Sequence, residues 1–582
     1  MKFIYIILFS VCSLINVQSQ KWDYNWLFGY FYDGLPQDGN WGIDNLNFNT
    51  KDGNPVVNNK STIQNDFDYY GSMISDREGR FLFSYDGTFV EDYIGRIPNN
   101  KAVCPDDDCR FFPQSTLILP NLIFDSIYYI FNLHDERIGN EWVCNVFSYS
   151  SLHELPNETG IRLDLAKKDL SKKLFQVGDA SSCRHANGRD WWIIAPGFNN
   201  NIYYFFILTD KLAYFSHTQA IGEKRIDGPG FCCFSPNGEY YAMATKRDSG
   251  YDTGALLYFQ HFDRSTGMFS NQQVFEIDTS MSVSAGCAFS PDNQILYVCS
   301  NHYLYQYPLQ NGKLNNRIEI AMYDGFESHL FGINYGVTTF GQLQNGPDGR
   351  IYLNSDQVQT KHLHVINEPN KIGLACDFQQ HSLPLKSVKI TMPYFPNYRL
   401  GPIDGSISDS LGINNMPYCW WRYQQDTLDH RHFKFTDASA YEVEEWYWDF
   451  GDGITSRDTS PLHTYSKNGV YDVCLIVKNK NGADTLCRTL YIGVVSNSDQ
   501  NKNIDFQLFP NPCTSFLIIN VNDYLPSKML MTIYDIQGKE VLHKRLYQGS
   551  NVIDLELMNA GVYIVEIKER GIVVKGEKLV KM

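Results

Sequence analysis

The chain has 582 residues, of which 15% are aromatic and 20% are charged, and its formal net charge is −16. This length exceeds what one hydrophobic core usually organises, so we expect two to four domains. The acidic balance, with no concentrated stripe of Lys and Arg, argues against nucleic-acid partners. Because Tyr and Phe favour strands, the predicted fold class is all-β.

The N-terminus has the pattern of a secretory signal peptide, predicted to cover residues 1–19. One lysine precedes an apolar run from Phe3 to about Val17, and small and polar residues follow, so cleavage is expected after Ser19. Cys12 raises the alternative of a lipoprotein signal, which the valine before it disfavours. No later segment has the ~18 uninterrupted apolar residues of a membrane helix, so no transmembrane segment is expected.

A recurring pattern runs through residues 74–355. Each copy is a polar turn with Gly or Asn, followed by a run rich in aromatic and aliphatic residues, which is typical of a β-hairpin. A weaker copy occupies residues 119–131. The clear copies are ISDREGRFLFSYDG (74–87), RHANGRDWWIIAP (184–196), CFSPNGEYYAMAT (233–245), AFSPDNQILYVCS (288–300) and QNGPDGRIYLNS (344–355).

The spacing of these copies predicts a β-propeller. The turn residues Gly188, Gly238, Asn293 and Gly349 follow one another at intervals of 50, 55 and 56 residues. A period of about 50 residues, with four short strands in each unit, is typical of propeller blades. Residues 20–402 are therefore expected to form a propeller of seven blades, with six blades as the alternative.

The same copies carry a resemblance to known propellers. FSPNGEY and FSPDNQILYV resemble, broadly, the blade motif of WD40-like propellers. ISDREGRFLFSYDG, HANGRDWW, GQLQNGPDGRIYL and LHVINEPN resemble the propeller of large surface and secreted proteins of the Bacteroidota, over most of residues 22–400. The resemblance implies a fold and an extracellular address, and it brings no catalytic residues with it.

Two cysteine pairs have spacings that favour disulfides. Cys104 and Cys109 bracket the sequence PDDD, and Cys474 and Cys487 lie on two runs joined by KNKNGAD, where they are expected to face each other across a hairpin. Neither pair has the spacing of a zinc site, so disulfides are favoured over a metal. Without Cys12, 13 of the 14 cysteines remain, and an odd number leaves at least one unpaired.

Trp191 and Trp192 are the candidate ligand-stacking residues of the propeller. Neighbouring residues of a strand face opposite sides, so one of the two is expected in the core and the other is available to stack on a sugar or a peptide. The alternative is that both are buried between blades. His362 and His364 fall on one face of a strand, and a polar strand face is the favoured interpretation.

Residues 419–494, after a linker at residues 403–418, resemble a PKD domain, which is an immunoglobulin-like β-sandwich. The resemblance rests on W-x-F-G-D-G at 448–453, H-x-Y at 463–465 and G-x-Y-x-V at 469–473. It covers the whole of this unit.

The first of these motifs contains a pair of carboxylates. Alternation along the strand places Trp448 in the core and Asp449 on the other face. The sequence Gly451-Asp452-Gly453 then makes a turn that needs glycine's backbone freedom. We interpret Asp449 and Asp452 as acceptors of backbone N–H groups, and a calcium site or a catalytic carboxylate pair are the alternatives.

The tail, residues 506–582, follows a polar linker at residues 495–505 and reads as a small β-sandwich. It closely resembles the type A C-terminal sorting domain of the type IX secretion system. That resemblance implies the type IX machinery as a partner, export to the cell surface or beyond, and attachment to surface lipopolysaccharide. The residues that carry the sorting signal in this reading are Pro510, Asn511, Pro512, Gly561, Tyr563, Lys578 and Lys581.

The sequence contains no motif that assigns a reaction. A nucleophile elbow, a phosphate-binding loop and a dinucleotide fingerprint are all missing, and HELPN at 153–157 lacks the second histidine of a zinc protease. We therefore predict a non-enzymatic, secreted surface protein whose propeller binds an extracellular glycan or protein, with the PKD domain as a spacer. The alternatives are a propeller-based polysaccharide hydrolase or lyase and a structural subunit of a surface or gliding assembly.

Overall fold

The computed structural model confirms the all-β prediction for the part of the chain that it describes. Apart from its strands, the described chain has one short 3₁₀ helix, η3 (Gly373–Cys376). The described residues are 20–30, 42–59, 63–67, 71–98, 103–104, 112, 114–138, 141–155, 160–225, 230–246, 254–278, 285–330, 333–355, 359–389, 391–426, 428–493, 506–510, 512–521, 529–535, 539–546, 549–555, 558–569 and 572–581. The predicted signal peptide and the linker at 495–505 lie outside them.

The chain divides into two compact units. One consists of Met1–Ser466 and Tyr471–Leu490, and the other of Lys467–Val470 and Tyr491–Met582. The first unit therefore contains most of the PKD-like region together with the expected propeller, and the second contains the tail. The domain boundaries near residues 402 and 419 stay predictions.

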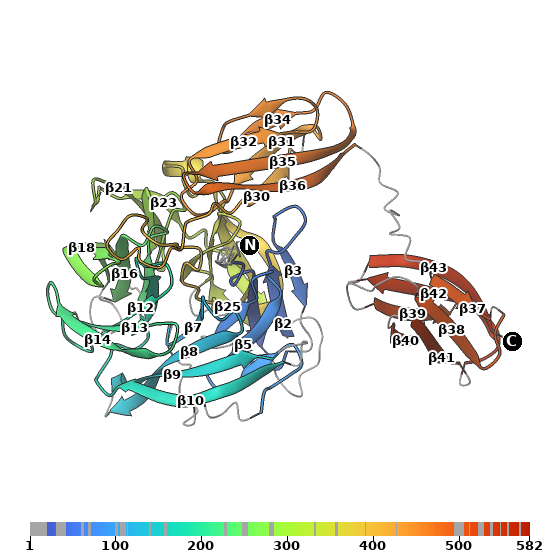
Figure 1. Cartoon of the computed structure of the whole chain (residues 1–582), viewed down its shortest axis with the longest axis horizontal. Helices are drawn as coiled ribbons and strands as arrows, with labels where there is room; N and C mark the ends of the chain where they lie inside the picture. Colours follow the sequence, from blue (N-terminus) through green and yellow to red (C-terminus); the bar gives the residue numbers. More distant parts are fainter. Residues whose placement is uncertain are drawn as a thin grey trace, which may run out of the picture. The chain divides into compact units, whose positions relative to one another are not determined.

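Small antiparallel sheets follow one another along the N-terminal region (Figure 1). Their strands pair in chain order, except in the sixth sheet, whose last strand pairs with its third. The first four sheets are β1 (Asn25–Tyr30), β2 (Gly42–Asn47) and β3 (Val56–Asn59); β4 (Ser72–Ser75), β5 (Phe81–Tyr85) and β6 (Val90–Asp92); β7 (Thr116–Pro120), β8 (Ile127–Ile138), β9 (Glu141–Glu154) and β10 (Ile161–Ser171); and β11 (Ser181–Arg184), β12 (Trp191–Pro196), β13 (Ile202–Leu208) and β14 (Ala213–Ala220).

Three more such sheets continue the series. They are β15 (Gly230–Phe234), β16 (Tyr240–Lys246), β17 (Ala255–Asp263) and β18 (Met268–Asp278); β19 (Gly286–Phe289), β20 (Ile295–Cys299), β21 (Tyr303–Gln310), β22 (Lys313–Leu314) and β23 (Ile318–Met322); and β26 (Leu343–Asn345), β27 (Ile351–Leu353), β28 (Thr360–Ile366) and β29 (Phe378–Lys389). A two-stranded ribbon, β24 (Glu327–Leu330) and β25 (Ile333–Val337), lies between the last two.

The repeated turn found in the sequence has the same place in five of these sheets. Gly79, Gly188, Gly238, Asn293 and Gly349 each follow the first strand of a sheet, and their φ angles lie between 63° and 81°. Only glycine, and less readily asparagine, adopts this left-handed conformation without strain. The sequence repeat is therefore a structural repeat, in which the turn opens the first hairpin of a sheet.

The sheets are propeller-like in their arrangement. The first strands of successive sheets lie side by side, as in β1 next to β4, β4 next to β7, β15 next to β19 and β19 next to β26. At the end of the series β29 packs against β1 and β2, and the Lys386 and Ser387 N–H groups donate to Asp44 Oδ2 at 2.7 and 2.6 Å. Closure into a propeller of seven blades stays a prediction.

One stretch of chain, residues 391–400, lies along the first strands; we call it the central segment. The Tyr398 hydroxyl donates to Ile118 O in β7 (2.8 Å), and Phe395 N donates to Gln344 Oε1 in β26 (3.1 Å). The central segment therefore lies against first strands of different sheets in the series. That this place is the channel of a propeller stays a prediction. The other contacts of the central segment near first strands are Thr391 Oγ1 to Phe67 O, Asn397 Nδ2 to Pro236 O, Arg184 Nη2 to Tyr398 O and Arg399 to the Asp23 carboxylate.

The next region is a sandwich of two antiparallel sheets. The shorter sheet has the order β30-β31-β34 and the longer one β33-β32-β35-β36. Trp448 and Trp421 lie in the core, 5.3 Å apart and edge to face. The strands are β30 (Trp421–Gln425), β31 (His432–Asp437), β32 (Glu445–Asp449), β33 (Thr455–Ser456), β34 (Leu462–Thr464), β35 (Gly469–Asn479) and β36 (Gly482–Ile492).

This sandwich packs tightly on the N-terminal sheets within the first unit. The buried Arg422 donates to Asp348 O (3.0 Å) and Asn367 O (3.2 Å), beside the last sheet of the series. Arg488 reaches Thr50 O at 3.1 Å, in the first sheet's loop. Burial lowers the pKa of Arg422 to about 10, and carbonyl groups satisfy part of its charge. Polar contacts thus hold the sandwich in one place.

The tail is a second, smaller sandwich, with sheets of order β37-β38-β41 and β40-β39-β42-β43. Its own core contains Leu517, Ile533 and Val565. Its strands are β37 (Phe506–Phe509), β38 (Phe516–Val521), β39 (Met529–Asp535), β40 (Glu540–Leu546), β41 (Gly549–Asp554), β42 (Gly561–Glu569) and β43 (Ile572–Lys581).

The predicted disulfide between Cys474 and Cys487 is confirmed, and it joins β35 to β36. Cys104 is also bonded in a disulfide, while its predicted partner Cys109 lies outside the described residues. Cys12 lies outside them as well.

Candidate functional site

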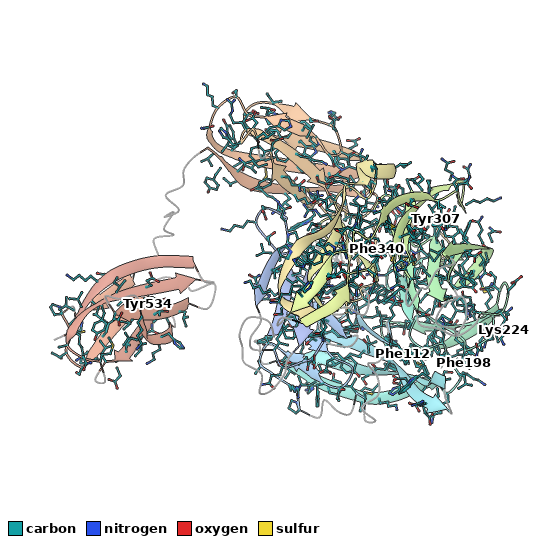
Figure 2. The ribbon with its side chains drawn as sticks, turned by 180° about the vertical axis from the view of Figure 1, so that it is seen from behind. Phe112, Phe198, Lys224, Tyr307, Phe340 and Tyr534 are labelled. Atoms are coloured by element: carbon teal, nitrogen blue, oxygen red, sulfur yellow. A yellow bond between two sulfur atoms is a disulfide. The ribbon has the colours of Figure 1, made fainter. Side chains whose placement is uncertain are left out.

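A cleft of about 600 Å³ opens where the fifth and sixth sheets of the series meet. Cavities of roughly 300–1,000 Å³ are the usual size of small-ligand sites. One wall is the end of the outer strand β18, and the other is the hairpin of β21 and β22 with the turn after it; Tyr307 is labelled in Figure 2. The lining residues are Phe275, Glu276, Tyr307, Leu314, Asn315, Asn316 and Arg317.

Arg317 fixes the two walls of the cleft relative to each other. Its Nη1 donates to the backbone carbonyl groups of Glu276 (3.2 Å) and Ile277 in β18. The guanidinium carbon also lies 4.4 Å from the centre of the Tyr305 ring, within the range of a cation–π contact. The cleft is thus preformed, because a side chain of the sixth sheet is bound to the backbone of the fifth.

Two aromatic rings form the inner part of the cleft. The Phe275 and Tyr307 rings lie 5.7 Å apart and are tilted by 56°. Tyr307 is only 2% exposed, and its hydroxyl makes no hydrogen bond of ordinary geometry. Burial raises the pKa of Tyr307, and the nearby Arg317 charge opposes that rise only in part. The phenol therefore stays protonated.

The chemistry of the lining suits binding. The partly exposed Phe275 ring, two side-chain amides, a guanidinium and a carboxylate supply a stacking surface and directed hydrogen bonds. Hydrolysis of a glycosidic bond generally uses a pair of carboxyl groups about 5–9.5 Å apart. The described lining of this cleft holds one carboxylate, that of Glu276.

Of the site residues predicted from the sequence, none that the structure describes lines this cleft. Phe275 and Tyr307 belong to different sheets, so no local pattern joins them. A signal that points to it is the turn NGKLNNR at 311–317, whose polar residues interrupt two β-runs. On its own this turn predicts an ordinary hairpin. Only the structure shows that β18 lies beside it and completes the cleft.

A propeller-based hydrolase or lyase, the alternative raised by the sequence, needs carboxylates that face an open cavity, and one carboxylate in the region of the central segment does not. Asp23, which lies there, is 4% exposed at its side chain and forms an ion pair with Arg399 at 2.5 Å. A carboxylate held in this way is a structural partner and does not face an open cavity.

The stacking surface predicted at Trp191 and Trp192 is contradicted by their burial. Trp191 is 1% exposed and Trp192 is 5% exposed. Trp191 packs against Tyr398 of the central segment and beneath the Arg184 guanidinium, while Trp192 Nε1 donates to Arg264 O at 2.8 Å. Strand alternation does place the two side chains on opposite faces of the sheet, but both faces are covered. The alternative stated above, that both tryptophans are buried, is therefore favoured over a role in ligand stacking.

His362 and His364 share a strand face, and the structure adds His381 to them. The His364 and His381 rings lie 4.5 Å apart, and His381 Nε2 lies 3.2 Å from Asp324 Oδ1. Burial is the main cause that lowers the pKa of all three rings. This cluster is therefore neutral near pH 7.

One contact in that cluster resembles a serine–histidine pair, since His364 Nε2 lies 3.2 Å from Ser355 Oγ. The other ring nitrogen, Nδ1, accepts the backbone N–H of His381 at 3.3 Å. A neutral His364 then carries its proton on Nε2 and donates it to Ser355. The hydroxyl is therefore an acceptor here and is not activated as a nucleophile.

The carboxylates of the W-x-F-G-D-G motif serve the turn. Asp449 Oδ1 accepts from Gly451 N (2.9 Å), and Asp452 Oδ1 accepts from Ile454 N (3.1 Å). Asp452 Oδ2 lies 2.8 Å from His463 Nε2. Among the described residues no group of three or more His, Cys, Asp or Glu is placed to hold a metal ion. Calcium binding at this turn stays a prediction.

The described sorting residues lie partly on the surface and edge of the tail and partly in its core, where Tyr563 is 8% exposed. Tyr563 donates its hydroxyl to Asn559 O at 2.9 Å, one turn before β42. Lys578 and Lys581 are on β43, the edge strand of its sheet, and Lys578 is exposed. Pro510 and Pro512 are exposed, Gly561 begins β42, and Asn511 lies outside the described residues. What these residues contact during export stays a prediction.

Two segments of the chain match known domain families. Residues 426–494 match the family described as PKD domain, and residues 507–582 match the secretion system C-terminal sorting domain. Both resemblances drawn from the sequence motifs are thereby confirmed. The sorting domain indicates that the protein is exported by the type IX machinery to the cell surface or the extracellular space. No helix of the described chain has the length and apolar character needed to cross a membrane.

Two curated collagenases share a short region with this chain. Collagenase ColQ1 of Bacillus cereus (strain Q1) is 42% identical over 113 residues, covering 17% of this chain. Collagenase ColA of Bacillus cereus (strain ATCC 14579) is 37% identical over 54 residues, covering 9%. The chain spans 12% and 6%, respectively, of the length of these relatives.

Similar solved structures include a PKD domain and a propeller. The PKD1 domain of Vibrio anguillarum Epp is 26% identical, with 14% of this chain and 95% of that chain covered and a TM-score of 0.13. The β-propeller domain of Myceliophteria thermophila Cps50 (Swd1) is 10% identical, with 58% and 95% covered and a TM-score of 0.31. Both scores are too low to establish a shared fold.

Proposed function

We propose that this exported protein binds an extracellular glycan in the cleft between β18 and the β21–β22 hairpin. In this proposal residues 20–402 form the recognition region, residues 419–494 hold it at a distance from the export signal, and residues 506–582 carry that signal. The two matched domains are non-catalytic, so any specific activity belongs to the N-terminal sheets.

The composition of the cleft is the observation that carries the proposal. A sugar ring has an apolar face and a rim of hydroxyl groups. Phe275 supplies a ring for the apolar face, with the buried Tyr307 ring packed behind it, while Asn315, Asn316 and Glu276 supply groups that bind hydroxyls. The rigid connection through Arg317 lowers the entropy that binding would otherwise cost.

A binding screen tests the proposal. The secreted protein is screened against polysaccharides and matrix proteins, and every polysaccharide is analysed for released products. Saturable glycan binding without products is the expected result. Binding to matrix proteins alone would replace the glycan by a protein partner, and released oligosaccharides would favour the hydrolase or lyase alternative.

A further inference from the structure

Cys233 and Cys287 bring two thiols together across neighbouring sheets. Cys233 lies on β15 and Cys287 on β19, and these first strands pack against each other. Their Sγ atoms are 3.6 Å apart, although 54 residues separate them in the chain. A disulfide bond is about 2.0 Å long, so the two sulfur atoms would need to approach by roughly 1.6 Å.

The neighbouring Cys232 is directed to other partners. Its Sγ lies 3.3 Å from Gln114 Oε1 and 3.1 Å from Asp179 O, because adjacent residues of a strand face opposite sides. Only Cys233 of the two therefore faces Cys287. The pairing follows from the alternation of side chains along β15 and from the packing of β15 against β19.

Export brings the chain into an environment in which cysteines can be oxidised. The protein is exported, and exported proteins fold where disulfides form and persist. The same chain already contains the Cys474–Cys487 disulfide. Cys287 is 2% exposed, whereas Cys233 is half-buried, so an oxidant reaches Cys233 first.

We propose that Cys233 and Cys287 form a disulfide in the exported protein, which links the fifth and sixth sheets on the side of their first strands. The oxidant is an external disulfide, either of a thiol oxidoreductase or of a small thiol. The Cys233 thiolate attacks it and releases one thiol, and Cys287 then displaces the second thiol from the mixed disulfide. Two cysteine thiols are oxidised and one external disulfide is reduced.

Peptide mapping tests the bond directly. Full-length protein collected outside the producing cell is denatured in acid without reductant, alkylated and digested. A peptide pair joined through Cys233 and Cys287, lighter by two hydrogen atoms than the separate peptides, is the expected result. Recovery of both cysteines in alkylated form would overturn the proposal.

A stability comparison provides an independent readout. We expect Cys233→Ser to lower the Tm of the exported protein by about 3–5 °C, because a loop of this length loses its cross-link. After reduction with a strong thiol reductant, wild type and variant should melt within about 1 °C of each other. Cys299→Ser, which removes a buried thiol on the adjacent strand β20, is the control whose difference from wild type should survive reduction. A Cys233→Ser difference that also survives reduction would contradict the disulfide.

Discussion

Arg399 and Asp23, which are 376 residues apart in the chain, form an ion pair in which Nη2 and Oδ2 are 2.5 Å apart. Arg399 is the last but one residue of the central segment, and Asp23 lies two residues before β1. Through this pair the chain that follows the last sheet is held at the beginning of the first one. The pair thus joins the two ends of the series of sheets.

Breaking this pair should destabilise the first unit. Arg399→Met leaves the Asp23 carboxylate buried without its partner, and such a change typically costs about 3–5 kcal/mol. We expect the free energy of unfolding, measured in urea by tryptophan fluorescence, to fall by that order. Asp23→Asn should act in the same direction. Unchanged stability in both variants would show that the pair does not hold the central segment.

The turn of the PKD domain offers a matched pair of glycines. Gly451 and Gly453 both have left-handed φ angles, of 77° and 90°. A Cβ at Gly451 would lie 2.7 Å from Asp472 O, whereas nothing lies within 4 Å of one at Gly453. We expect Gly453→Ala to cost about 1 kcal/mol from backbone strain alone, and Gly451→Ala to cost clearly more. Equal changes in Tm would refute the proposed clash.

Lys389 makes stability depend on pH. Its Nζ is buried without a hydrogen-bond partner among the described residues, and burial lowers its pKa to about 7. The unfolded chain takes up this proton near pH 10.4, so stability falls as the pH drops from there towards 7 and is constant below that. Between pH 10.4 and 7 the free energy of unfolding falls in total by on the order of 4 kcal/mol.

Lys389→Met should therefore be more stable than wild type at pH 7, and the advantage should shrink as the pH rises towards 10. Urea unfolding at several pH values measures this difference. Lys371→Met, at an exposed position, is the control and should show no such trend. If the stability advantage of Lys389→Met did not vary with pH, burial would not lower the pKa of Lys389, and the prediction would be wrong.

The tryptophans at the fourth sheet should matter for folding and not for binding. Trp192 is packed between sheets, and its indole N–H donates to Arg264 O. We expect Trp192→Ala to cost about 3–5 kcal/mol, and Trp192→Phe to cost less. Thermal unfolding measures the cost. A Trp192→Phe variant that is as stable as wild type but binds the ligand more weakly would contradict this prediction and support a stacking role for Trp192.

The sequence predicted those parts of the fold that local chemistry controls. The turns at Gly188, Gly238 and Asn293 were found because a left-handed φ restricts the residue type. The disulfide between Cys474 and Cys487 was found because a hairpin places its two strands in register. In each case the constraint acts within one hairpin.

Features that depend on distant segments could not be predicted. The central segment forms no named strand, and only the placed sheets show that Tyr398 reaches β7. The cleft needs Phe275 and Tyr307 from two sheets. The burial of Trp191 depends on what covers each strand face, which alternation does not reveal.

The most direct test of the account is a calorimetric titration of the glycan found in the screen, using wild type, Phe275→Ala and Tyr214→Ala. Tyr214 is an exposed aromatic residue, 46% accessible, on β14 of another sheet. The account predicts that Phe275→Ala weakens binding at least about tenfold, corresponding to ~1.4 kcal/mol, while Tyr214→Ala binds like wild type. Wild-type affinity in a correctly folded Phe275→Ala protein would contradict the cleft as the binding site.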